Sequence, residues 1–261
     1  MGLNLGKKNG NPFMRQAFSG QAGVKATTTR NILDLDMTGR NPAQGTMTVD
    51  GAVNKSILLF AIMIAAAGVG FLFPNMLFVW GGILGGAGIM FWASRSLEKS
   101  NILAPIYAVL EGLFVGSITA MYGAMFDGIV FNAVLLTLAV FLMMLLIYKT
   151  GIIKVTPNFR AGVSMAVGAV MIVYLISIVG HFIGFEIPFL HSGGLLGIGI
   201  SVVIIGIASL NLLLDFDNFD KGADARLPEH MEWFFSMGLL FTVIWLYVEI
   251  LRLLAILASS D

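Results

Sequence analysis

The sequence contains no cysteine, and charged side chains make up only 11% of its 261 residues. The missing cysteine excludes disulfides, thiol catalysis and thiolate metal sites. A soluble domain carries about 25% charged residues, so the shortage of charge, together with 57% hydrophobic residues, indicates a membrane protein. The 15 basic and 15 acidic side chains balance, which argues against nucleic acid as a partner.

Motifs of the common enzyme and metal-site classes are also missing. The three histidines, His181, His191 and His230, are scattered and form no HxxxH or HxxE pattern, so no zinc site is expected. There is no GxSxG, HExxH or Walker sequence, and no nucleophile lies beside a base. We therefore predict a protein that is not an enzyme and that uses no cofactor.

The first part of the chain differs from the rest. Residues 1–50 are polar and rich in Gly, Asn, Thr and Gln, without the apolar run that a signal peptide needs. We expect a flexible cytoplasmic tail here and a membrane domain over residues 51–261. Partner binding through the NILDLDM stretch at 31–37 is the functional alternative for the tail.

Seven apolar segments follow, each suited to a hydrocarbon core that is roughly 30 Å thick. They cover about residues 57–73, 76–93, 102–126, 129–148, 162–185, 193–214 and 233–257. The second segment is rich in glycine, and small residues let neighbouring helices approach closely. The sequence therefore predicts an all-α integral membrane protein with seven transmembrane helices.

Basic residues are confined to one side of this arrangement. The tail and the loops after the second, fourth and sixth segments contain Lys or Arg, whereas the loops around Pro74, Asp127 and 186–191 contain none. Because cytoplasmic loops are enriched in basic residues, we expect the N-terminus in the cytoplasm and the C-terminus on the opposite side. The lack of cysteine and of a signal peptide fits a bacterial plasma membrane.

The last segment carries the strongest candidate for function, Glu249, deep in an apolar run. A carboxylate there costs about 2.5 kcal/mol or more on insertion scales, so it should face protein or water rather than lipid. An ion pair with Arg252, one helical turn away, is the structural interpretation. A protonatable or cation-binding carboxylate is the functional one.

Other ionisable groups lie in or beside the apolar segments. Asp215, Asp217 and Asp220 end the sixth segment, and three close carboxylates resemble a site for a hard cation such as Ca²⁺; a solvated acidic loop is the alternative. Glu111 lies near the middle of the third segment, where it would be neutral, paired or lining a cavity. Arg95, a lone basic residue at a cytoplasmic end, is more typical of an orientation signal than of a gate.

Several stretches resemble one known family. DFDNFDKGAD at 215–224, MEWFFSMGLL at 231–240 and WLYVEILRLLAIL at 245–257 are similar to the Bax inhibitor-1 family (transmembrane BAX inhibitor motif proteins), most of all to its bacterial branch. IYAVLEGLFVGSIT at 106–119 and MTVDGAVNKS at 47–56 are similar to further parts of that family. The resemblance covers about residues 47–261.

The resemblance implies a fold in which the last helix is central and ringed by the other six. It also implies a pH-sensitive leak of cations, usually Ca²⁺, controlled by two carboxylates that share a proton. Matching the motifs places these groups at Asp217 and Glu249, the second being Glu where the family usually has Asp. Asp217 and Glu249 thus become the expected proton-sensing and Ca²⁺-binding groups, and the partners are the lipid bilayer, Ca²⁺ and protons.

Helix geometry sets a condition on this pair. If the turn between the last two helices centres near residue 225, the depths of Asp217 and Glu249 differ by roughly 24 Å at 1.5 Å per residue, too far for contact. The two meet only if the connection lies along the membrane surface or if the sixth helix is broken. Glu249 could instead pair with Glu111 or with Arg252.

Two other functions are compatible with the sequence. One is a scaffold that binds other membrane proteins through the tail or the glycine-rich segment without conducting ions. The other is a proton-coupled transporter of a small solute, although the two halves of the chain show no convincing repeat.

Overall fold

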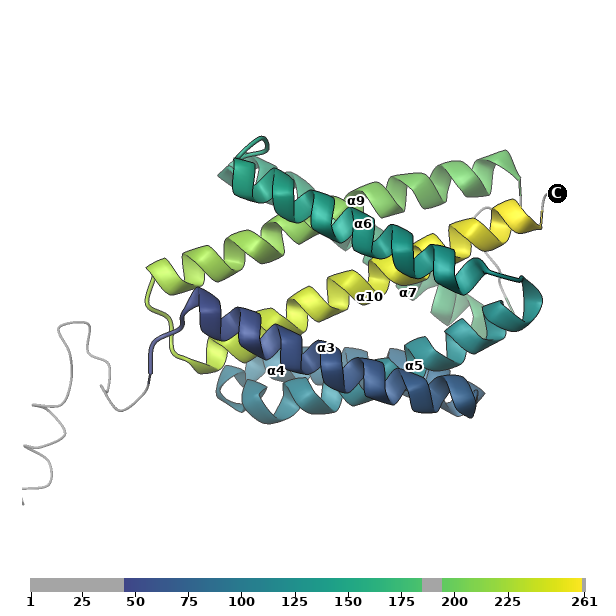
Figure 1. The fold of residues 1–261 in the computed structure, drawn as a ribbon, viewed down its shortest axis with the longest axis horizontal. Coiled ribbons are helices and arrows are strands. Elements are labelled where there is room, and N and C mark those ends of the chain that lie inside the picture. Colours follow the sequence, from purple (N-terminus) through teal and green to yellow (C-terminus); the bar gives the residue numbers. More distant parts are fainter. Residues whose placement is uncertain (1–44, 185–193, 260–261) are drawn as a thin grey trace, which may run out of the picture. The chain divides into compact units, whose positions relative to one another are not determined.

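Seven helices that are long and apolar enough to cross a membrane make up most of the described part of the chain (Figure 1). The computed structural model describes residues 45–184 and 194–259. The helices are α3 (Val49–Leu72), α4 (Met76–Arg95), α5 (Ser100–Met125), α6 (Ile129–Thr150), α7 (Pro157–Ile183), α9 (Leu195–Asp224) and α10 (His230–Ala258), with a short 3-10 helix, η2 (Leu97–Lys99), before α5. The predicted all-α fold with seven membrane-spanning helices is confirmed.

Two predictions fall on residues outside these ranges. The polar tail lies outside them up to residue 44, so its flexibility and its partner-binding stretch at 31–37 stay predictions. The loop at 186–191, with His191, also lies outside the described residues.

Local signals set the ends of several helices. After Pro74, the side chain of Asn75 caps α4 by accepting a hydrogen bond from the backbone N–H of Leu77 at 2.8 Å. Gly151 ends α6 in the left-handed region, at a φ of 68°, where glycine has no steric penalty. These turns explain why the predicted ends of the second and fourth segments are within two residues of the observed ones.

The sixth helix is longer than its apolar segment. α9 continues to Asp224, whereas the segment was predicted to end at 214. Asp215 and Asp217 lie on these extra turns and are buried, together with Phe216 and Phe219. The interpretation of this stretch as a solvated loop is therefore wrong for Asp215 and Asp217, which are buried in a helix, whereas Asp220 is exposed on the same helix.

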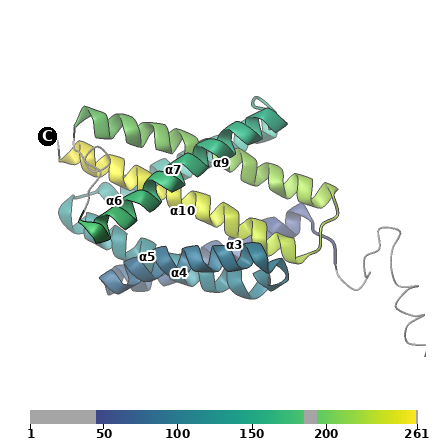
Figure 2. The same cartoon turned by 180° about the vertical axis from the view of Figure 1, so that it is seen from behind.

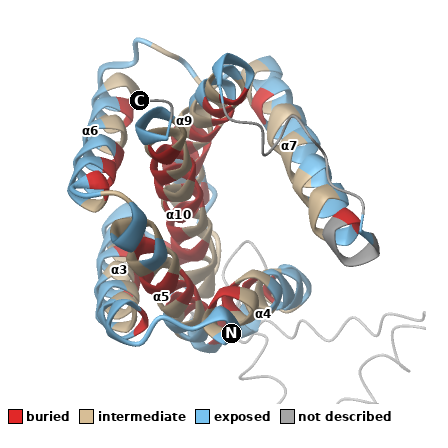
Figure 3. Cartoon of the chain, turned by 90° about the vertical axis from the view of Figure 1, so that its right-hand side faces the viewer, coloured by how far each residue is buried: buried red, intermediate tan, exposed pale blue. Residues whose placement is uncertain are grey.

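The last helix has the largest buried share of the seven spanning helices. In its most apolar window 61% of α10 is buried, compared with 6% for α7. α10 packs against α3, α5, α6 and α9, and it runs through the middle of the end-on view in Figure 3. α4 packs on α5 and α7 packs on α9, and Figure 2 shows both toward the outside. α10 thus packs closely against these four helices, and a complete ring of six stays a prediction.

α3 and α5 approach each other with backbone against backbone. A Cβ atom on Gly116 would lie 2.0 Å from the carbonyl oxygen of Ala67, and one on Gly112 would lie 2.4 Å from that of Met63. Gly70 of α3 has the same relation to Leu113 of α5, at 2.4 Å. Only glycine leaves room for this contact, which fixes the two helices against each other.

The predicted close approach of the glycine-rich segment is confirmed. On α4, a Cβ on Gly82 would lie 2.3 Å from the Cβ of Phe114, and one on Gly86 would lie 2.2 Å from Oε1 of Glu111. Both partners belong to α5. The part of the glycine-rich face formed by Gly82 and Gly86 is therefore covered within the chain, which removes it as a docking surface for another membrane protein.

Gly116→Ala should destabilise the fold. The added methyl group meets a backbone oxygen that cannot move without shifting α3, at an expected cost of about 1–3 kcal/mol. The measurement is the thermal unfolding midpoint of the purified protein in detergent. Gly68→Ala is the matched control, because a Cβ at Gly68 has no neighbour within 4 Å. Equal midpoints for the two variants would contradict the backbone contact.

Candidate functional site

Glu249 is held by side chains from its own helix and from α7. It is 3% exposed, and its Oε2 lies 2.9 Å from Nη2 of Arg252. The hydroxyl of Tyr174 on α7 donates a hydrogen bond to Oε1. Arg252 also donates to Oγ of Ser201 on α9 at 3.2 Å. The structural interpretation of Glu249, an ion pair with Arg252, is thus observed, and the pair joins three helices.

Asp217 has two basic partners. The guanidinium of Arg160, in the first turns of α7, contacts Oδ2, and Nζ of Lys221 lies 2.7 Å from the same oxygen. Arg160 also donates to Oδ1 of Asn218 at 2.7 Å. These contacts tie the start of α7 to the last turns of α9.

Asp215 is buried among uncharged groups. It is 8% exposed, and Nδ2 of Asn211 lies 3.4 Å from its Oδ2. The same amide donates to Oγ1 of Thr242 on α10 at 2.9 Å. Among residues 45–184 and 194–259, Asp215 has no ion-pair partner, unlike Asp217 and Glu249.

These three carboxylates lie along the α9–α10 pair at different depths. We call the end of the bundle near the α9–α10 turn the hairpin end. At 1.5 Å per residue, Asp217 lies roughly 10 Å, Asp215 roughly 14 Å and Glu249 roughly 28 Å along its helix from the hairpin end. The arrangement is a series of separated acidic groups rather than one cluster.

The proton-sharing contact between Asp217 and Glu249 is not formed in this structure. α9 and α10 are each continuous, and only a short turn joins them, so neither geometric condition for the contact is met. The two carboxylates instead belong to separate ion pairs, with Arg160 and with Arg252. The same separation prevents both from holding one Ca²⁺ ion.

The acidic residues of α9 do not converge on a metal site either. Residues two positions apart on a helix face different directions, so Asp215 and Asp217 have different neighbours. Asp220 accepts a hydrogen bond from the hydroxyl of Tyr148 on α6 at 2.5 Å. Within the described ranges, no three His, Asp or Glu side chains are grouped in a way that could hold a metal ion.

The other two candidate residues lie away from the α9–α10 pair. Glu111 is 8% exposed and lies at the contact of α5 with α4, next to Gly86. The guanidinium of Arg95 lies over the ring of Phe91, 3.6 Å from its centroid, at the exposed end of α4. Glu111 is therefore placed with α4 rather than with Glu249.

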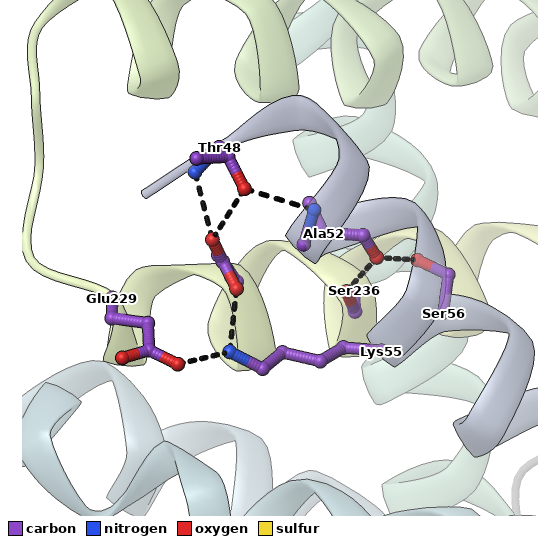
Figure 4. A network of polar contacts seen from close by, with 8 residues as sticks. Thr48, Ala52, Lys55, Ser56, Glu229 and Ser236 are labelled. Atoms are coloured by element: carbon purple, nitrogen blue, oxygen red, sulfur yellow. Dashed lines mark hydrogen bonds and ion pairs between the residues drawn. The ribbon is translucent and has the colours of Figure 1, made fainter. Parts of the chain in front are cut away.

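One buried acidic group was missed by the sequence analysis. Glu232, near the start of α10, is 3% exposed and accepts hydrogen bonds from the backbone N–H of Thr48 at 2.7 Å and from its hydroxyl at 3.2 Å. Nζ of Lys55 on α3 lies 2.5 Å from Glu232 and 3.0 Å from Glu229 (Figure 4). No local pattern connects Lys55 with Glu232, because 177 positions separate the two residues.

The partners on α7 were also missed. Arg160 lies between the fourth and fifth apolar segments, and Tyr174 lies in the fifth without any recognised motif. No local pattern marks either residue as the partner of a carboxylate on another helix.

The sequence is similar to one family of proteins. A family model described as Bax inhibitor 1 like matches residues 11–259. The chain belongs to this family. The match begins earlier than the stretch from residue 47 on which the resemblance was based, so it includes most of the tail. Comparisons with curated proteins and with solved structures give no match.

Membership of the Bax inhibitor 1 like family agrees with the fold. The seven apolar helices and the family match together identify an integral membrane protein whose outer helices contact the lipid bilayer. The family match does not by itself assign roles to Asp217, Asp215 or Glu249.

Glu232→Gln should destabilise the protein more than Glu229→Gln. Glu232 is buried and accepts three contacts, so loss of its charge should cost about 1–3 kcal/mol. The side chain of Glu229 is 59% exposed, and an exposed ion pair contributes about 0–1 kcal/mol. Thermal unfolding of both variants in the same detergent measures the difference. Equal losses would show that the buried network does not anchor α10.

Proposed function

We propose that this protein is a cation leak pathway, with Ca²⁺ as the conducted ion, that opens when Glu249 takes up a proton. The observation that carries the proposal is the buried ion pair of Glu249 with Arg252 in the most buried spanning helix. The family match supports a channel-like membrane protein. The choice of ion and the control by pH follow from the resemblance and from the chemistry of this site.

The ionised form of Glu249 favours a closed arrangement. Its carboxylate binds the guanidinium of Arg252 and the hydroxyl of Tyr174, and this holds α7 and α10 together. The guanidinium lies where a cation would otherwise approach the carboxylate. Charge pairs interact strongly at low dielectric, so the arrangement resists opening.

Protonation of Glu249 removes the negative charge from this pair. Arg252, whose side chain is 20% exposed, keeps its hydrogen bond to Ser201 but no longer faces an opposite charge at Glu249, which is unfavourable in a low-dielectric site. A rearrangement that brings Arg252 into contact with water, and moves α7 away from α10, relieves this cost. We therefore expect the leak to increase as the pH falls.

The carboxylates nearer the hairpin end provide the entry of the proposed pathway. Asp217 and Asp215 lie between Glu249 and that end, and acidic side chains attract cations to pores. Arg160 and Lys221 cover Asp217 in the closed form, and they would have to move when a cation enters.

We also propose that the hairpin end faces the cytoplasm of a bacterial cell. The start of α3 and the connections after α4, α6 and α9 meet at that end, and they contain the basic residues of the loops. The positive-inside rule then orients the chain with its N-terminus in the cytoplasm. The C-terminus lies on the opposite side.

Ca²⁺ flux into proteoliposomes tests the role of Glu249. The wild-type flux should increase from neutral to mildly acidic pH. Glu249→Gln, which is neutral at every pH, should show a high flux already at neutral pH and no pH dependence. Glu111→Gln is the matched control, because it neutralises a buried carboxylate at the α4–α5 contact and should keep the wild-type response. The absence of flux above empty liposomes at every pH would contradict the leak, and a wild-type pH profile in Glu249→Gln would contradict its control by this residue.

Tyr174→Phe tests the closed arrangement without changing the charge of Glu249, because it removes only one hydrogen bond to the carboxylate. The hydroxyl of Tyr174 donates to the ionised carboxylate, so its removal should favour protonation and move the pH of half-maximal flux upward by about one unit. Tyr247→Phe is the control, since this tyrosine of α10 is bonded to the hydroxyl of Thr119 at 2.8 Å and not to a carboxylate. An equal shift in both variants would rule out a specific effect at Glu249.

A further inference from the structure

A long groove opens between α3 and α6, and its inner wall is formed by α9 and α10. Its volume is about 1150 Å³. α3 and α6 lie on the side of α10 that is away from α7 (Figure 3). The proposed ion pathway uses none of the residues that line this groove, so the groove requires a separate explanation.

Away from the hairpin end, the groove offers mainly apolar surface to a ligand. Its lining there includes Phe60, Ile64, Leu138, Phe141 and Val243. Two hydroxyl groups also line it, but Ser56 donates to the carbonyl oxygen of Ala52 at 2.8 Å and Thr137 donates to that of Ala133 at 2.7 Å. With these groups satisfied, the space is unfavourable for water and suits a hydrocarbon chain.

The groove runs along the helices, and its length matches one leaflet of a bilayer. Its lining extends from Val49 to Ile64 on α3 and from Thr137 to Lys149 on α6. At 1.5 Å per residue, each of these stretches is roughly 20 Å long. A bilayer with its headgroup regions is about 40–45 Å thick, so one leaflet occupies about the same length.

The polar mouth of the groove lies at the hairpin end and presents two ammonium groups. Lys149 and Lys154 line the mouth and both are exposed, and neither ammonium group forms a side-chain hydrogen bond or an ion pair with the described part of the chain. The acidic groups nearby are differently placed. Asp220 accepts a hydrogen bond from the hydroxyl of Tyr148. Asp50 lies in the first turn of α3, where the helix dipole favours a negative charge.

We propose that this groove binds one anionic glycerophospholipid from the leaflet at the hairpin end. An acyl chain lies along the apolar wall between α3 and α6, and the headgroup phosphate lies between Lys149 and Lys154. Basic sites between spanning helices are suited to anionic headgroups, and the apolar wall below them accounts for the chain. The site does not depend on ion conduction.

Native mass spectrometry of the full-length protein, released from detergent, measures this binding directly. The probes are phosphatidylglycerol and phosphatidylcholine with identical acyl chains, titrated separately. We expect one tightly retained phosphatidylglycerol and weaker retention of phosphatidylcholine. Lys149→Gln/Lys154→Gln should weaken phosphatidylglycerol binding by roughly tenfold or more and bring it to the level of phosphatidylcholine.

Two further variants separate the groove from general surface charge. Arg95→Gln/Lys99→Gln removes two basic side chains at the same end of the bundle, outside the groove, and should leave binding unchanged. Leu138→Trp fills the apolar wall and should reduce the retention of both lipids. The proposal is overturned if phosphatidylcholine binds as tightly as phosphatidylglycerol to the wild type. It is also overturned if Lys149→Gln/Lys154→Gln and Arg95→Gln/Lys99→Gln lose equal affinity for phosphatidylglycerol, or if Leu138→Trp retains lipid as the wild type does.

Discussion

The pairing of buried carboxylates within the protein is the constraint on which this structure depends. Lipid is as apolar as the helix surfaces, so apolar contact alone gives spanning helices little reason to choose one arrangement. α10 is fixed near its start by Glu232 with Lys55 of α3, and farther along by the hydrogen bonds of Glu249 with Tyr174 of α7 and of Arg252 with Ser201 of α9. Between them, Ser236 donates to the carbonyl oxygen of Ala52 at 2.8 Å, which adds a further contact with α3. Each of these contacts has a defined direction and position, so together they determine the rotation and register of the central helix.

Close backbone packing complements these polar contacts. The glycines of α3, α4 and α5 join three helices through surfaces on which no larger residue fits. The polar contacts, by contrast, attach α10 to α3 and connect α7 to α9 and α10. Close packing thus joins α3, α4 and α5, and polar contacts attach the remaining helices to them and to one another.

The sequence was sufficient to predict the helices but not the partners of the acidic residues. Hydropathy located α6 and α4 within two residues of their ends, because apolar runs and turn residues are local signals. The end of α9 was misplaced, because its last turns are acidic and their stability comes from other helices. Arg160 is separated from Asp217 by 57 positions and Tyr174 from Glu249 by 75, so no local pattern connects them. Helix geometry did predict that Asp217 and Glu249 are too far apart to touch if the turn centres near residue 225, and the observed ends of α9 and α10 meet that condition.

The attachment of α7 has a mechanical consequence. This helix has the smallest buried share of the spanning helices, and its side chains reach the carboxylates of the last two helices at two points, through Arg160 and through Tyr174. Two fixed points along a rod define both its position and its tilt, whereas one point leaves it free to swing. Under the proposed mechanism, loss of the deeper contact at Tyr174 leaves α7 attached through Arg160 and through its packing on α9, so the far end of the helix gains more freedom to move than its first turns.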